Sequence, residues 1–148
     1  MTTPLRPTQA GTTEVQRLLR HHTGQALKAL HGEQPLPDAA VHEARKQLKK
    51  ARADLRLLRT ALGSQTYAYE NTALRDAARP LTTVRDARVL LDTLDTLVAS
   101  SGAEAHALDL DPVRLALQEE QQFPLIALEP LSRMSLTWSV RDGAGILP

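Results

Sequence analysis

Residues 41–62 read VHEARKQLKKARADLRLLRTAL, and this stretch carries the clearest structural pattern of the chain. Its apolar residues recur at alternating steps of three and four, which is the spacing of one buried face of an α-helix. The stretch therefore predicts a helix that presents one face to a core. The residues of that face are Val41, Ala44, Leu48, Ala51, Leu55, Leu58 and Leu62.

A stripe of basic residues runs beside this apolar face. At about 100° per residue, its five side chains fall within roughly a quarter-turn of the helix surface. Like charges at i,i+4 repel each other, so a solvated helix face usually mixes its signs, and here no acidic residue shares the line. We expect either an anion against the stripe or a solubilising basic face, because charge runs are often solvated. The stripe consists of His42, Arg45, Lys49, Arg52 and Arg56.

Length and composition limit the choice of class. A chain of 148 residues with 42% hydrophobic residues suits one folded domain. The net charge of +1 favours neither an anionic nor a cationic partner, so binding of a polyanion must come from local segregation of charge. The lack of cysteine excludes disulfides and thiolate metal sites. Without an apolar leader or a run of about 18 apolar residues, we expect a cytoplasmic protein with no membrane span.

Four amphipathic helices are expected within residues 12–101, after a flexible lead-in over residues 1–11. The first is capped by Thr12 or Thr13, and Pro80 should break or kink the chain between the third and the fourth. Helices joined by short polar loops form an antiparallel bundle, so we predict an all-α fold with a four-helix bundle. The expected helices cover about residues 12–31, 38–62, 65–79 and 82–101.

The helical pattern weakens over residues 102–148. Asp111 followed by Pro112 predicts the start of a short extra helix, which should end near Gln122. The last 25 residues show no helical period, and we expect an irregular C-terminal tail. Within it Leu136, Trp138 and Val140 alternate with polar neighbours, as in a strand that has no partner strand.

The sequence holds no catalytic constellation. It has no phosphate-binding loop of the P-loop type, no nucleophile elbow and no cysteine nucleophile, so we expect no enzyme and no cofactor. His42 and Glu43 begin like a zinc-protease motif, but Lys46 stands where the second ligand would be, and no metal site is expected. His22 falls on the apolar face of the first helix and is predicted to be a hydrogen-bonded core histidine.

Further arginines on the later helices could extend the basic surface. Arg75 and Arg79 belong to the expected third helix. Arg85 would lie in the first turn of the fourth helix, where free backbone N–H groups favour an anion. Arg88 precedes Asp92 by four residues and is expected to pair with it.

Two motifs together resemble the CHAD family of α-helical domains. The first is His42-x-x-Arg45-x-x-x-Lys49-x-x-Arg52-x-x-x-Arg56, preceded by Val41. The second is LRDAARPLTTVRDARVLLDTL at residues 74–94, in which Arg85 and Asp86 open a leucine-rich helix. The resemblance covers about residues 12–100, and the two motifs are more specific together than either is alone.

The resemblance implies an all-α domain that binds inorganic polyphosphate in a basic channel and does not catalyse a reaction. It also implies a domain about twice as long, built from two similar bundles. This chain would then be half of a typical domain, either completed as a homodimer or truncated with altered binding. Carried over by position, the channel residues are those of the stripe with Arg85, flanked by Lys46 and Arg88.

Two other functions remain alternatives. A basic helix could follow the phosphates of a nucleic acid, but the four aromatic residues do not interleave with the stripe, which weighs against base stacking. The chain could also be a helical protein-interaction module whose stripe meets an acidic partner. Binding of polyphosphate, of nucleic acid or of neither would separate the three.

Overall fold

The structure, a computed structural model, describes residues 8–106 and 108–134, and every regular element in them is helical. This confirms the predicted all-α helical bundle. The elements are α1 (Gln9–Leu30), α2 (Asp38–Leu57), α3 (Arg59–Leu62), α4 (Ser64–Ser101), α5 (Ala103–His106), α6 (Asp111–Glu120) and a 3₁₀ helix at Leu125–Leu128, followed by helical residues 129–134.

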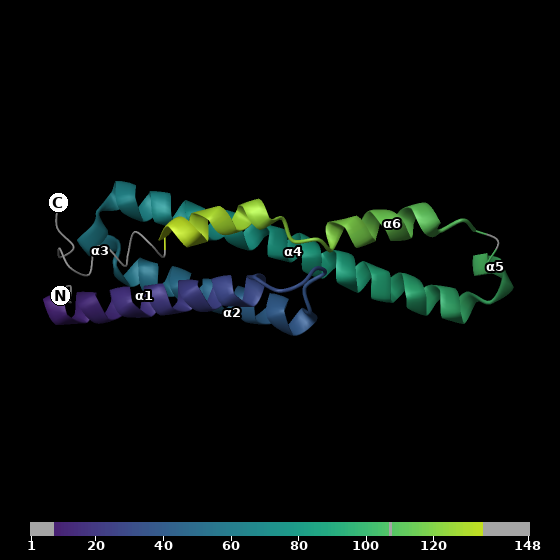
Figure 1. Cartoon of the computed structure of the whole chain (residues 1–148), viewed down its shortest axis with the longest axis horizontal. Helices are drawn as coiled ribbons and strands as arrows, with labels where there is room; N and C mark the ends of the chain where they lie inside the picture. Colours follow the sequence, from purple (N-terminus) through teal and green to yellow (C-terminus); the bar gives the residue numbers. More distant parts are fainter. Residues whose placement is uncertain (1–7, 107, 135–148) are drawn as a thin grey trace, which may run out of the picture.

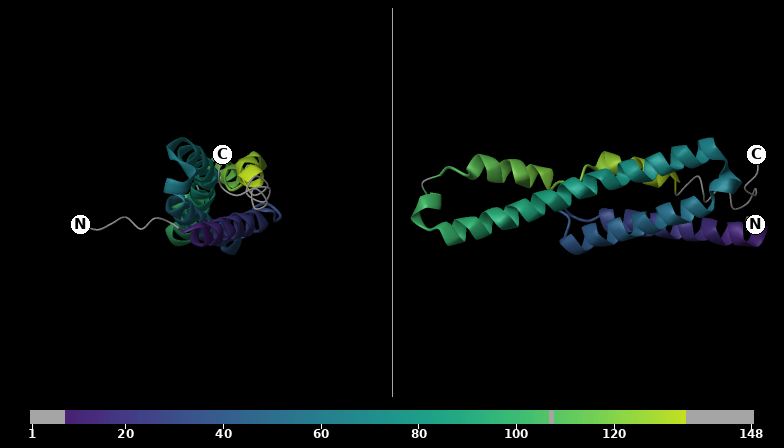
Figure 2. Two further views of the ribbon diagram at one scale, coloured as in Figure 1. Left: turned by 90° about the vertical axis from the view of Figure 1, so that its left-hand side faces the viewer. Right: turned by 180° about the vertical axis from the view of Figure 1, so that it is seen from behind.

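The long helix α4 spans the whole molecule (Figure 1). Near the end where α4 begins, α2 lies against its first half, and α1 packs antiparallel on α2. The second half of α4 runs past α1 and α2, and α6 returns along it, as the view from behind also shows (Figure 2). The molecule is therefore a bundle with a two-helix hairpin projecting from one end.

Helix α2 has the apolar face that its sequence predicts. Its predicted face is buried from Val41 to Leu58, and Leu62 is partly buried against the same core. The helix is interrupted at Leu58, and the chain turns at Gly63, whose positive φ of 80° suits glycine because it has no Cβ. This turn sends α4 back along α2.

Helix α4 corrects the expectation of two helices separated at Pro80. The helix continues through Pro80, although proline lacks the N–H that would bond one turn back. Leu74 and Ala77 before it and Leu81 and Val84 after it are all buried, and they share one face in unbroken register. Packing of this face on both sides of Pro80 outweighs the local preference for a break.

The start of the first helix also differs from the prediction. Helix α1 begins at Gln9, and the hydroxyl of Thr8 caps it by accepting a hydrogen bond of 3.2 Å from the backbone N–H of Gly11. Thr12 and Thr13, the predicted caps, lie inside the helix and donate their hydroxyls to carbonyls one turn back. A threonine can satisfy either kind of bond, so the sequence pattern did not distinguish them.

Residues 125–134 are helical where an irregular tail was expected. Phe123, Leu128, Leu131 and Met134 are buried in the core, which orders this segment against the bundle. Pro124 and Pro130 interrupt the segment, so its apolar spacing is too short to show a clear period. The strand-like residues Leu136, Trp138 and Val140 lie outside the described residues.

One core joins all parts of the bundle. Its most buried large side chains come from α1, α2, α4 and the segment after the 3₁₀ helix. In the described part of the chain, no helix combines the length and the apolar character that crossing a membrane requires. The core is centred on Leu19, Leu30, Leu48, Leu55, Leu74, Leu81, Leu131 and Met134.

Candidate functional site

The basic stripe lies along the edge of α2, beside the buried face. Arg52 is half-buried and the other four members are exposed, whereas neighbouring Ala44, Leu48 and Ala51 are buried. The stripe therefore borders the core and does not point straight away from it. This edge of α2 faces α4.

Helix α4 forms the other wall. Because α2 and α4 run antiparallel, the end of α2 meets the start of α4, and Arg52 Nε donates to Asn71 Oδ1 at 3.4 Å. At the opposite end His42 and Arg45 meet Arg85. Asn71 and Arg85 are two heptads apart, so they lie on one flank of α4. We call the surface between the basic stripe of α2 and this flank of α4 the groove, and it is hollowed where His42, Arg45 and Arg85 line a cavity.

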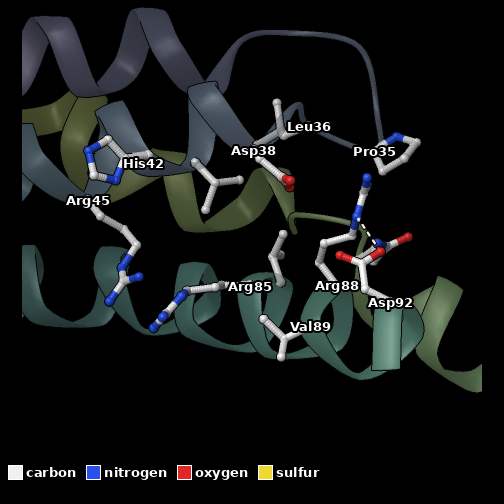
Figure 3. Close-up of a pocket in the computed structure, with 12 residues that line it drawn as sticks. Pro35, Leu36, Asp38, His42, Arg45, Arg85, Arg88, Val89 and Asp92 are labelled. Carbon is white, nitrogen blue, oxygen red and sulfur yellow. Dashed lines mark ion pairs between the residues drawn. The ribbon is translucent and has the colours of Figure 1, made fainter. Parts of the chain in front are cut away.

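The groove deepens into a cavity of about 250 Å³ near the start of α2. Figure 3 shows the guanidinium groups of Arg45 and Arg85 pointing to the same space, with His42 beside them. Leu36, Val41, Val84 and Val89 supply apolar wall, while Asp38 and Asp92 stand at the far end. The lining is completed by Pro35, Arg88 and Gln121.

Four exposed cations of the groove have no carboxylate partner in the described part of the chain, and half-buried Arg52 has only the amide of Asn71 there. Within the described residues, no ion pair involves Arg45, Lys49, Arg56 or Arg85. Arg85 lies in the middle of α4, where the backbone N–H groups are used by the helix, so the expected first-turn anion site at Arg85 is wrong. Only its side chain is available to an anion.

The two flanking candidates are already paired with acids. Arg88 Nε lies 3.4 Å from Asp92 Oδ1, which confirms the predicted pair (Figure 3). Lys46 Nζ lies 2.5 Å from Glu43 Oε2. The amide of Gln47 and then the ammonium of Lys46 lower the pKa of Glu43, so this carboxylate stays charged. Lys46 and Arg88 therefore have less charge to offer an anion than the unpaired cations.

Other charged residues named from the sequence serve the bundle itself. Arg75 and Arg79 both lie near Asp76, at 3.5 and 3.8 Å, and do not extend the groove as unpaired charges. Asp86 is exposed in the middle of α4, so it caps no helix. His22 Nδ1 lies 2.5 Å from Asp54 Oδ2 across the α1–α2 contact, which confirms a hydrogen-bonded histidine at the core.

Three groove residues were missed from the sequence. Asn71 could have been found from its two-heptad spacing to Arg85, once α4 is read as a continuous helix. Asp38 was expected only as the first residue of the second helix, and Gln121 reaches the cavity from the segment after α6, which no local pattern indicates. Among the residues that the structure describes, no group of histidines and acids is arranged to hold a metal ion.

The family comparison agrees with this geometry. A family model described as CHAD domain matches residues 10–127, which is most of the chain. The chain belongs to the CHAD family. The match contains both motifs of the resemblance, and it extends beyond residue 100 to include α6. No curated protein and no solved structure matches this CHAD protein.

Proposed function

We propose that this CHAD protein binds inorganic polyphosphate in the groove between α2 and α4, without catalysing a reaction. The observation that carries the proposal is the row of exposed cations without carboxylate partners, namely Arg45, Lys49, Arg56 and Arg85. Their mutual repulsion is relieved when a chain of negative charge lies between them.

The length of the row favours an extended ligand. From His42 to Arg56 the stripe covers about 21 Å at 1.5 Å per residue, and neighbouring members are about 5–6 Å apart. One compact phosphate contacts only one or two of these positions. A linear polyphosphate can contact all of them, with arginines as forked donors and Lys49 as a mobile charge.

The aromatic residues favour polyphosphate over nucleic acid. The ring of Tyr67 is covered by the guanidinium of Arg59 at 5.2 Å, and the ring of Tyr69 by that of Arg133 at 4.7 Å. Phe123 is buried in the core. Tyr69 is 58% exposed, but no phenylalanine, tyrosine or tryptophan of the described residues lines the cavity that His42, Arg45 and Arg85 share, so base stacking, which sequence-tolerant binding of single strands uses, has no partner there.

A titration with polyphosphate of defined length tests the proposal. Replacing Arg45, Lys49, Arg56 and Arg85 with alanine should weaken binding about 10³-fold at moderate salt, while circular dichroism shows unchanged helicity because all four side chains are exposed. Single-stranded and duplex DNA serve as competitors. Unchanged polyphosphate affinity in the variant, or complete displacement by DNA of equal charge, would contradict the proposal.

We propose that a second copy of the chain is the other partner. The support is apolar surface on the projecting hairpin, where Leu90, Leu97 and Val113 are more than half or half exposed. A surface of this kind on two projecting helices is costly to leave in water.

A further inference from the structure

The projecting hairpin differs in charge from the rest of the molecule. We call residues 89–120, the second half of α4 with α5 and α6, the acidic hairpin, because they hold seven acids and a single arginine. Residues 8–88, the basic body, hold 14 lysines and arginines and eight acids. The net charge of +1 is thus a near-cancellation between two regions of opposite sign.

The two long helices of the acidic hairpin face each other through a defined flank. Arg114 Nη1 lies 2.6 Å from Asp95 Oδ1 and marks the inward side of both helices. Leu91 is buried and Val98 half-buried on the same side of α4. The inward side is therefore closed by residues of the hairpin itself.

The next flank of both helices is apolar and exposed. Leu90 and Leu97 each precede an inward residue of α4 by one position, and Val113 precedes Arg114 in the same way. In a right-handed helix, the residue before an inward-facing one is turned about 100° away from the neighbouring helix. Because α4 and α6 run in opposite directions, this turn brings such residues of both helices to the same side of the hairpin. Leu90, Leu97 and Val113, exposed by 52%, 56% and 50%, thus lie on one side of the hairpin and form what we call the apolar face, with Glu120 one heptad beyond Val113 on the same flank.

We infer that this face docks on the same face of a second copy, so that two acidic hairpins pair into a four-helix bundle. The inference rests on the self-association proposed above and does not depend on polyphosphate. Two helices alone cannot enclose a core, whereas two identical hairpins supply the four that a bundle needs. A two-fold axis also lets the apolar face of one copy contact the identical face of the other copy.

The size of the face sets the strength of the contact. The α4 part of the hairpin is about 20 Å long, and two helices at about 10 Å spacing are about 20 Å wide. This gives about 400–500 Å² from each copy, or about 800–1,000 Å² in total, which is at the small end for a specific interface. The dimer is therefore weak and forms at micromolar or higher concentration.

The acids around the face make this contact depend on salt in an unusual direction. Each hairpin carries a net charge of −6 from its lysines, arginines and acids, so two hairpins repel each other at low ionic strength. The Debye length falls from about 10 Å at 0.1 M salt to about 3 Å at 1 M, so salt removes the repulsion and leaves the apolar burial. The dimer should tighten as salt rises, whereas polyphosphate binding by the groove should weaken.

Sedimentation of the full chain at about 0.1 M and about 1 M salt tests the inference, over a range of concentration. We expect a monomer–dimer equilibrium whose dissociation constant falls at least about threefold at high salt, as screening of a few rim charges predicts. Leu97→Glu should give a monomer throughout. A monomer mass for the unchanged chain at every concentration, or a dimer that loosens with salt, would overturn the inference.

The matched control is Leu115→Glu in the same hairpin. Leu115 is 60% exposed and lies two residues from Val113, about 200° further round α6, so it faces away from the apolar face. It adds the same charge as Leu97→Glu and should leave the dimer nearly unchanged. Equal weakening by both variants would overturn the assigned face. Binding of short polyphosphate by the Leu97→Glu variant reports on the groove separately, so that failure of one proposal is not mistaken for failure of the other.

Discussion

The basic body and the acidic hairpin share one helix but use it differently. In the basic body the first half of α4 packs on α2, which packs on α1, and its cation Arg85 stands across the groove from the stripe of α2. In the acidic hairpin the second half of α4 has one helical neighbour of comparable length, α6, and leaves Leu90 and Leu97 exposed. Sequence-averaged charge and hydropathy describe neither region, because binding properties follow from how residues are segregated.

The two ends of the groove also differ in electrostatic potential. A polyanion in the groove is attracted along the stripe toward Arg56 and repelled at the other end, where Asp38 and Asp92 stand before the acidic hairpin. The hairpin therefore bounds the binding region electrostatically and is expected to remain uncovered by polyphosphate.

The largest expected effect is on the groove. Alanine at Arg45, Lys49, Arg56 and Arg85 should weaken polyphosphate binding about 10³-fold, from about 1 kcal/mol for each of four lost contacts. Isothermal titration calorimetry measures the loss.

A double variant separates the effect of the groove position from the effect of the total charge of the protein. Arg45→Ala with Lys49→Ala should cost about 30-fold in affinity, as about 1 kcal/mol per contact predicts. Arg17→Ala with Lys28→Ala removes the same charge from exposed positions on α1 and should cost much less. Equal losses in both double variants would show that total charge, and not the groove, determines binding.

The next effect compares one substitution in the two halves of α4. Leu81→Ala removes a fully buried side chain and should lower the free energy of unfolding by about 2–5 kcal/mol. Leu97→Ala, at an exposed position of the same helix, should change it by no more than about 0.5 kcal/mol in the monomer. Urea denaturation at low protein concentration measures both, and similar values would contradict the difference in packing.

A smaller effect is expected at the α1–α2 contact of the basic body. Asp54→Ala leaves His22 half-buried without its carboxylate partner, at a cost of about 1–3 kcal/mol in the free energy of unfolding. Asp86→Ala, on an exposed part of α4, is the control and should be nearly neutral. Thermal unfolding at neutral pH detects the difference, and a neutral Asp54→Ala would contradict a structural role for the pair.

The smallest effect concerns the boundary between the two regions. Asp92→Asn removes a carboxylate from the end of the groove and releases Arg88 from its ion pair. Polyphosphate affinity should rise by at most about fivefold, which corresponds to the upper end of the roughly 0.2–1 kcal/mol typical of an exposed charge pair. Asp95→Asn, whose partner Arg114 lies within the hairpin, should leave the affinity unchanged. A fall in affinity with Asp92→Asn would contradict the boundary.

The features that the sequence predicted correctly all follow from regular spacing of residues within a single helix. The spacing from Val41 to Leu58 predicted the buried face of α2, His22 fell on the apolar face of α1, and Arg88 stood four residues before Asp92. Each depends on positions a few residues apart in one helix, where helical geometry alone decides which side chains meet.

What the sequence did not predict depends on contacts between distant segments. Pro80 stays inside α4 because Leu74 and Leu81 are both held by the core. Met134 is ordered by packing on the bundle, which no local period shows. The site was recovered as a stripe from α2, but Asn71 and Gln121 joined it only when α4 and the segment after α6 were in place. The charge of the hairpin became visible once residues 89–120 were seen to project together.

The salt dependence of polyphosphate binding tests the central claim most directly. The logarithm of the affinity should fall linearly with the logarithm of salt concentration, and each lost phosphate contact should reduce the slope by roughly 0.7, by analogy with single-stranded nucleic acids. The account predicts that alanine at Arg45, Lys49, Arg56 and Arg85 lowers both the affinity and this slope. A variant with the affinity and slope of the unchanged chain would contradict it.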